Sequence, residues 1–156
     1  MCITKQYKFN KLFKQESFIQ YFNQRFEIET LFNLLNEDEI DKLLNFNVVF
    51  IRCYSPSAKV DLKGLQIDGK LTLISFDANY YSYLMPDEFV AIILHEIGHV
   101  FNPDVQDIEG EYAADSFATR KGYAKWIISG LKKGMKKKWI GFEVDKCQPR
   151  IDRLCN

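Results

Sequence analysis

The sequence predicts an α+β fold, in which N-terminal helices precede a small antiparallel sheet that packs on a buried helix and a second, polar helix. Apolar residues recur at helical spacing in the first third of the chain, and runs rich in β-forming residues follow. A nearly all-apolar helix then carries both histidines of the sequence. With 156 residues, 47% of them hydrophobic, the chain is long enough for one domain, 1–156, with its own core.

The N-terminal third predicts packing helices. Ser17 can cap a helix that carries Phe18 and Phe22, and Asn36, which acidic residues follow, opens a short helix with Ile40. We expect these helices to cover the core rather than to carry chemistry.

The sheet is predicted from the segments 46–54 and 65–74. The first is rich in β-forming residues, and the second contains Asp68-Gly69, the two-residue signal of a hairpin, between the apolar runs 65–67 and 71–74. We therefore expect the strands to be antiparallel.

Two helices and a tail complete the expected fold. Pro86 and the acidic residues after it begin a helix that runs to about Phe101. A second helix begins at Asp107 and ends near Gly122, and an amphipathic stretch leads into a run of lysines. From about residue 146 we expect an irregular tail.

The charge of the whole chain indicates no polyanionic partner, because 21 basic residues balance 21 acidic ones. Basic residues gather in segment 120–138, where a solvated face is favoured over a nucleic-acid site, although that site stays an alternative. The sequence has no secretory signal and no apolar run of membrane-span length, so we expect a cytoplasmic protein. The four cysteines form no CxxC pair, which is typical of free thiols.

The chemistry is predicted from the run His95-Glu96-Ile97-Gly98-His99. His95 and His99 are one helical turn apart on one face, so both can present a ring nitrogen to the same Zn²⁺. Placing two imidazoles in an apolar helix costs free energy unless each has a strong partner, and a metal ion supplies one. Glu96 projects beside them and can take the proton of an attacking water.

The remaining zinc ligand cannot be a histidine, because the chain has only two. Glu111 and Asp115 are one turn apart, with small alanines between them that permit close helix packing. We predict that Glu111 is the third ligand and that Asp115 accepts the second ring N–H of a ligating histidine. A fourth position would stay open, with one zinc per chain.

These two motifs resemble those of the gluzincin family of metallopeptidases. HEIGH followed by EYAAD is similar to the HExxH plus ExxAD pattern of the CaaX prenyl proteases and HtpX-like peptidases, over roughly residues 87–123. The resemblance implies a minimal zincin-like fold, zinc bound by His95, His99 and Glu111, Glu96 as base, and Asp115 as an orienting residue. The chain also resembles, more weakly, the ImmA/IrrE-type metallopeptidases.

The predicted reaction is hydrolysis of a peptide bond in a protein or peptide substrate. Zinc polarises the carbonyl, and Glu96 moves the proton from water to the leaving amine. Candidate donors to the oxyanion are Tyr112, Tyr123 and Arg120, together with the tyrosines of segment 80–83. By resemblance to zincins, strand 71–76 is the edge to which an extended peptide would add.

Two alternatives stay open. One is a regulatory peptidase that cleaves a single repressor or antitoxin. The other is a zinc-stabilised binding module without catalysis, which would use segment 120–138. Glu96 favours catalysis, because a closed structural zinc site has no use for a free carboxylate beside it.

Overall fold

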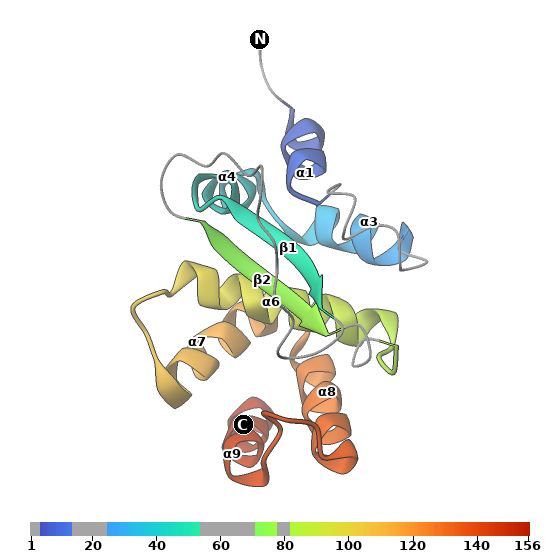
Figure 1. The fold of residues 1–156 in the computed structure, drawn as a ribbon, viewed down its shortest axis with the longest axis vertical. Helices are drawn as coiled ribbons and strands as arrows, with labels where there is room; N and C mark the ends of the chain where they lie inside the picture. Colours follow the sequence, from blue (N-terminus) through green and yellow to red (C-terminus); the bar gives the residue numbers. More distant parts are fainter. Residues whose placement is uncertain (1–3, 14–24, 54–70, 78–81) are drawn as a thin grey trace. The chain divides into compact units, whose positions relative to one another are not determined.

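The computed structural model of the chain describes residues 4–13, 25–53, 71–77 and 82–156. These residues form two compact units, Met1–Tyr83 and Leu84–Asn156, which are treated separately below (Figure 1). The α+β class with N-terminal helices agrees with the sequence prediction. The helix start predicted at Ser17, the Asp68-Gly69 hairpin, Tyr80 and Tyr81 all lie outside the described residues.

The described part of the first unit consists of helices and a two-stranded sheet, with α1 and α4 packed against its first strand. Helix α1 contacts both other helices and the first strand, and three of its side chains are buried. Phe13 is the centre of this packing, because its ring lies 4.5 Å from that of Phe9 and 4.9 Å from that of Phe50. The elements are α1 (Lys5–Phe13), α3 (Arg25–Leu34), α4 (Glu37–Asn45), β1 (Val48–Cys53) and β2 (Thr72–Asp77).

Helix α4 begins at Asn36, as the sequence predicts. The Asn36 side chain accepts a hydrogen bond from the Glu39 backbone N–H, and the Glu39 carboxylate accepts one from the Asn36 N–H, both at 2.8 Å. This capping box satisfies two backbone donors that the first turn of a helix leaves without partners.

The prediction of an antiparallel sheet was wrong, because β1 and β2 are parallel. Val48 pairs with Thr72, and the register continues to Cys53 opposite Asp77. The hairpin signal concerned the segment just before β2, whereas the observed pair joins β1 to β2 across the connection 54–71. A connection of that length permits a crossover, which parallel strands require and a two-residue turn cannot provide.

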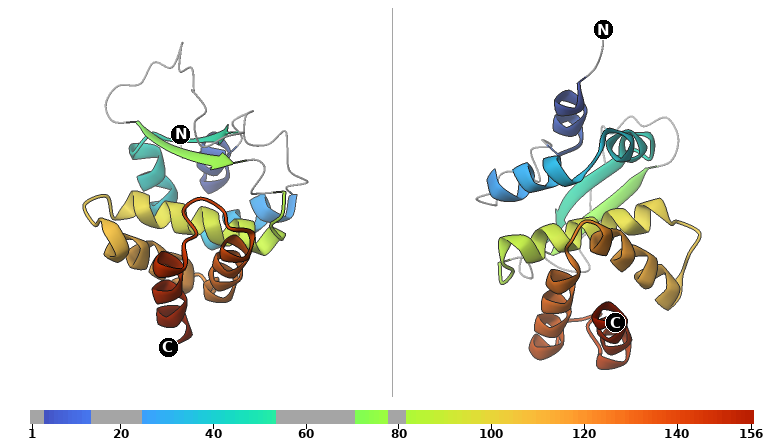
Figure 2. Two further views of the ribbon diagram at one scale, coloured as in Figure 1. Left: turned by 60° about the horizontal axis from the view of Figure 1, so that its bottom comes forward. Right: turned by 180° about the vertical axis from the view of Figure 1, so that it is seen from behind.

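The second unit contains four helices: α6 (Pro86–Phe101), α7 (Asp107–Arg120), α8 (Ala124–Lys137) and α9 (Val144–Cys155). Helix α6 packs mainly against α7 and also against α8, while α9 contacts both α7 and α8 (Figures 1 and 2). Helices α6 and α7 lie close to the ranges that the sequence predicts, and the amphipathic stretch after them forms α8. Helix α7 ends in a turn at Gly122, whose φ of 87° lies in the left-handed region that favours glycine.

The irregular tail predicted from about residue 146 was also wrong, because this segment is helix α9. Cys147 and Ile151 are buried and lie one turn apart on one face of the helix. Pro149 favours the prediction of an irregular segment, since proline removes a backbone donor. It is the sixth of the twelve residues of α9, and the buried apolar face of the helix outweighs the lost hydrogen bond.

Helices α6 and α8 are joined by a buried carboxylate. Glu88, which is 1% exposed, accepts hydrogen bonds from the Ser129 hydroxyl at 2.6 Å and from the Lys133 ammonium group. It also accepts one from the Met85 backbone N–H at the start of α6. Burial raises the pKa of Glu88, but these hydrogen bonds outweigh it and hold the pKa below its ordinary value.

Replacing Lys133 by methionine is expected to destabilise the fold by about 2–4 kcal/mol at neutral pH, because it leaves the Glu88 carboxylate buried without its cation. In the parent, the lowered pKa contributes stability above the unfolded pKa of Glu88, and that stability is lost as pH falls through the folded pKa. The variant should therefore lose less stability between neutral and acid pH. Denaturation at pH 7 and pH 3.5 measures both effects, with exposed Lys132→Met as the matched control.

No helix in the described ranges has both the length and the apolar character that crossing a bilayer requires. The lysine run predicted from the sequence lies on α8 and just after it. Its members Lys132, Lys136, Lys137 and Lys138 are exposed, as expected of a solvated face.

Candidate metal centre

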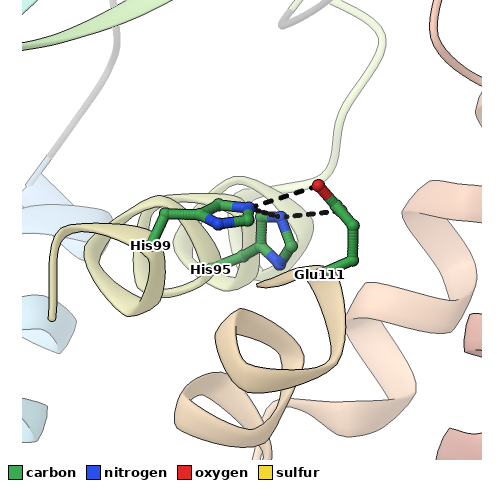
Figure 3. A group of neighbouring side chains, drawn as sticks. All are labelled: His95, His99 and Glu111. Carbon is green, nitrogen blue, oxygen red and sulfur yellow. Dashed lines mark hydrogen bonds and ion pairs between the residues drawn. The ribbon is translucent and has the colours of Figure 1, made fainter. Parts of the chain in front are cut away.

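Three side chains of the second unit converge on one point. His95 and His99 come from successive turns of α6, and Glu111 comes from the first half of α7 (Figure 3). The Nε2 atoms of the two histidines are 3.1 Å apart, and each lies 3.4 Å from an oxygen of Glu111. This is the His–His–Glu group that the sequence predicts, and it could hold a metal ion.

The spacing of these atoms fits a small divalent cation. In a tetrahedral zinc site, bonds of 2.0–2.1 Å place neighbouring ligand atoms about 3.3 Å apart. The two ring nitrogens are 3.1 Å apart, and each lies 3.4 Å from a different oxygen of Glu111. With one ligand atom taken from each residue, all three atoms lie within 4.8 Å of one another. Figure 3 shows the two imidazole rings and the carboxylate pointing toward one another. The donor set of two imidazoles and one carboxylate is one that zinc accepts.

Close packing of α6 and α7 brings Glu111 to the histidines. Gly98 lies one residue before His99, and a Cβ atom built on it would lie 2.6 Å from the Cα of Ala114. Only a residue without a side chain allows the two backbones to approach so closely. The sequence motif therefore encodes the helix contact as well as the ligands, since Gly98 belongs to the first motif and Ala114 to the second.

Asp115 fixes the ring of His95. Its Oδ1 lies 2.8 Å from Nδ1 of His95, and the carboxylate is 4% exposed. With Nδ1–H donated to Asp115, the Nε2 lone pair of His95 is left facing His99 and Glu111. Asp115 thus lies where the sequence predicts a carboxylate that orients a ligating histidine.

Arg150 is the site residue that sequence reasoning missed. Its guanidinium group donates to both oxygens of Asp115, at 2.8 Å from Nε and 2.7 Å from Nη2, and its Nη1 lies 2.5 Å from Glu111 Oε2. It comes from α9, the segment predicted to be irregular. The apolar spacing of Val144, Cys147, Ile151 and Leu154 is the signal that could have identified this helix.

The pKa values of the cluster reflect burial and pairing together. Burial lowers the pKa of His95, but hydrogen bonds with Asp115 and Glu111 outweigh it and raise the pKa to about 9. Burial raises the pKa of each of these two carboxyl groups, yet hydrogen bonds, first with His95, hold both pKa values below their ordinary range. Since a ligating imidazole must be neutral, a proton and a metal ion compete for His95.

Glu96 follows His95 on α6 and is half-buried. One residue further along a helix is a rotation of about 100°, which places its carboxylate on a neighbouring face from that of the two histidines. Its negative charge contributes to the raised pKa of His95.

The three candidate oxyanion donors have different surroundings. Tyr112 follows Glu111 in α7, and its ring lies 4.3 Å from the guanidinium carbon of Arg153. The Tyr123 hydroxyl lies 3.4 Å from Oδ1 of Asp87. Asp87 is about two turns before His95 in α6. Arg120 stacks over Phe117 near the end of α7. Arg150, by contrast, contacts the ligand group directly through Glu111.

A cleft with a volume of about 850 Å³ opens beside the ligand group. His99 and Glu111 form part of its wall, and further wall residues come from the first turns of α7 and α9. The ligand group is therefore accessible to a molecule from the cleft, which a closed structural metal site does not need.

Comparison of the chain with protein-family models, curated proteins and solved structures found no match. The gluzincin and ImmA/IrrE resemblances therefore rest on the motif residues alone.

Proposed function

We propose that this chain is a zinc-dependent metallopeptidase in which His95, His99 and Glu111 hold the metal and Glu96 is the general base. The observation that carries the proposal is the convergence of three ligand atoms, all within 4.8 Å of one another, beside an accessible cleft. Asp115 accepts a hydrogen bond from His95, and Arg150 donates to Asp115 in turn, so these two residues orient the ligand. The substrate class is a protein or peptide segment.

The metal, when bound, would polarise the scissile carbonyl and make a water molecule more acidic. Side chains of the protein orient the ligands and transfer the proton. His95 and His99 direct their Nε2 lone pairs to one point, and Asp115 keeps His95 in the tautomer that permits this. Glu96 accepts the proton of the attacking water and returns it to the leaving amine, which balances the hydrolysis.

Two features favour catalysis over a structural metal site. The ligand group has three members within the described residues, which leaves one position of a tetrahedral ion for a further ligand. Two of the three members, His99 and Glu111, line an open cleft. A binding module stabilised by zinc would require neither feature.

Replacing Glu96 by glutamine is expected to keep one zinc per chain and to lower the rate of peptide hydrolysis by about 10²–10⁴-fold, because the base is lost and the ligands are kept. Metal analysis and a peptide-cleavage assay measure the two quantities. The matched control is Glu109→Gln, an exposed glutamate on α7, which should change neither. Undiminished cleavage by the Glu96→Gln chain would overturn the mechanism, and a parent that binds no zinc would overturn the whole proposal.

A further inference from the structure

The wall of the cleft beside the ligand group combines the metal ligands with exposed apolar residues. Val105 and Ile108, from the loop before α7 and from its first turn, line the cleft and are 41% and 37% exposed. Gly141, from the loop before α9, and Asp145, from its first turn, also line the cleft. The volume of about 850 Å³ lies within the range of about 300–1,000 Å³ that binding pockets have.

Exposed apolar side chains gather at this place. The second unit exposes five large apolar side chains, and besides Val105 and Ile108 these are Met85 at 55%, Ile140 at 83% and Val144 at 66%. Ile140 and Val144 each directly precede a residue that lines the cleft, whereas Met85 does not. Single exposed apolar residues are normal on a protein surface, but a group of them around a concave site indicates a binding surface.

The charges of the cleft argue against an acidic ligand. Lys146 pairs with Glu143 at 3.1 Å, and Arg150 pairs with Asp115 and Glu111, so both cations on the wall are already neutralised. Asp107 and Asp145 add negative charge to the same wall. Away from the metal, an acidic side chain would therefore be repelled by Asp107 and Asp145, whereas an apolar one would contact Val105 and Ile108.

We propose that this cleft binds a large apolar side chain of the peptide substrate, on the residue next to the scissile bond. The proposal rests on the peptidase function above. Because His99 and Glu111 are part of the cleft wall, a side chain seated in the cleft lies beside the ligand group, and we therefore place its residue next to the scissile bond. The substrate class is thus an extended segment with a leucine-sized or aromatic residue beside the cleaved bond.

Peptide binding by the zinc-loaded, full-length Glu96→Gln chain tests the inference without catalysis. The probes are fluorescent peptides of glycine and serine that carry a single Leu, a single Lys, a single Asp or none of these residues. We expect the Leu peptide to bind at least about tenfold more tightly than the peptide without it, as removal of an apolar side chain from a fitted pocket does. Equal affinities, or tightest binding of the Lys peptide through Asp107 and Asp145, would overturn the inference.

Substitutions in the cleft wall test whether the Leu side chain binds there. Val105→Ser and Ile108→Ser, each added to the Glu96→Gln chain, should reduce the preference for Leu to less than about threefold, while zinc content stays at one per chain. Met85→Ser, which also removes an exposed apolar side chain, is the matched control and should leave the preference unchanged. Since all three side chains are exposed, folding should be unaffected, and circular dichroism checks this. A preference that survives both wall substitutions would contradict the assignment of the cleft.

Mapping of cleaved bonds with the parent chain separates the two proposals. Cleavage beside Leu or Phe supports both. Cleavage without an apolar preference leaves the peptidase function standing and overturns the cleft assignment. Absence of cleavage by the zinc-loaded parent overturns the peptidase function, and the binding series then decides the cleft assignment by itself.

Discussion

Replacing Arg150 by glutamine is expected to lower the free energy of unfolding of the metal-free chain by about 3–5 kcal/mol, the range for breaking a buried ion pair from one side. Asp115 is 3% exposed and would lose two charged hydrogen bonds, and Glu111 would lose the cation beside its Oε2. His95 alone would then compensate the charge of Asp115. Chemical denaturation in the presence of a chelator measures this change.

The same substitution is expected to weaken zinc binding by about 10–100-fold, which is typical when the residues that orient metal ligands are changed. The visible spectrum of the Co²⁺-substituted chain should also change, because it reports the geometry of the ligands. Arg150→Lys should not restore either property, since one ammonium group cannot replace the fork that binds both oxygens of Asp115.

Arg153→Gln is the matched control for Arg150. It lies one turn further along α9, is exposed, and stacks on the ring of Tyr112. Its loss should change stability by no more than about 1 kcal/mol and leave the Co²⁺ spectrum unaltered. Equal effects of the two substitutions would show that α9 acts through general packing rather than through the Arg150 guanidinium.

Replacing Gly98 by alanine is expected to destabilise the fold by about 3 kcal/mol or more, although the intrinsic helix preference alone favours alanine by about 1 kcal/mol. The new methyl group would meet the Ala114 backbone at 2.6 Å, and backbone atoms cannot move aside as a side chain can. Separation of α6 from α7 would carry Glu111 away from the histidines, so zinc affinity should fall as well. Thermal denaturation and zinc titration measure the two effects.

Ser116→Ala controls for an added helix-forming residue near the same contact. Ser116 is exposed on α7, so its replacement should change stability by less than about 0.5 kcal/mol and leave zinc affinity unchanged. If Gly98→Ala proved as stable as the parent, the close contact of the two helices would not be what positions Glu111.

The ligand group could be predicted from the sequence because its chemistry is local. His95 and His99 need only a helix to lie on one face, and Glu111 and Asp115 need only a second helix with small residues at the contact. The boundaries of α6 follow from Pro86 at its start and Pro103 after its end. Such features depend on residues only a few positions apart.

The direction of the sheet and the role of Arg150 could not be predicted in this way. Pairing of β1 with β2 depends on how the connection 54–71 runs, and the Asp68-Gly69 signal concerns only its last part. Arg150 meets Asp115 across 35 positions of sequence, and no short motif joins them. Pro149 also disfavours a helix locally, because proline lacks a backbone N–H donor, whereas the buried apolar face of α9 favours one.

The close contact of Gly98 with Ala114 has a consequence for the order in which the site assembles. Helices α6 and α7 are joined by the short connection 102–106, whose closure is among the fast events of folding. His95, His99, Glu111 and Asp115 all belong to this helical hairpin, whereas Arg150 arrives with α9. We therefore expect the hairpin to capture the metal ion early and α9 to dock afterwards, so that in stopped-flow refolding with Co²⁺ the ligand-field absorbance should rise before α9 becomes protected from hydrogen exchange.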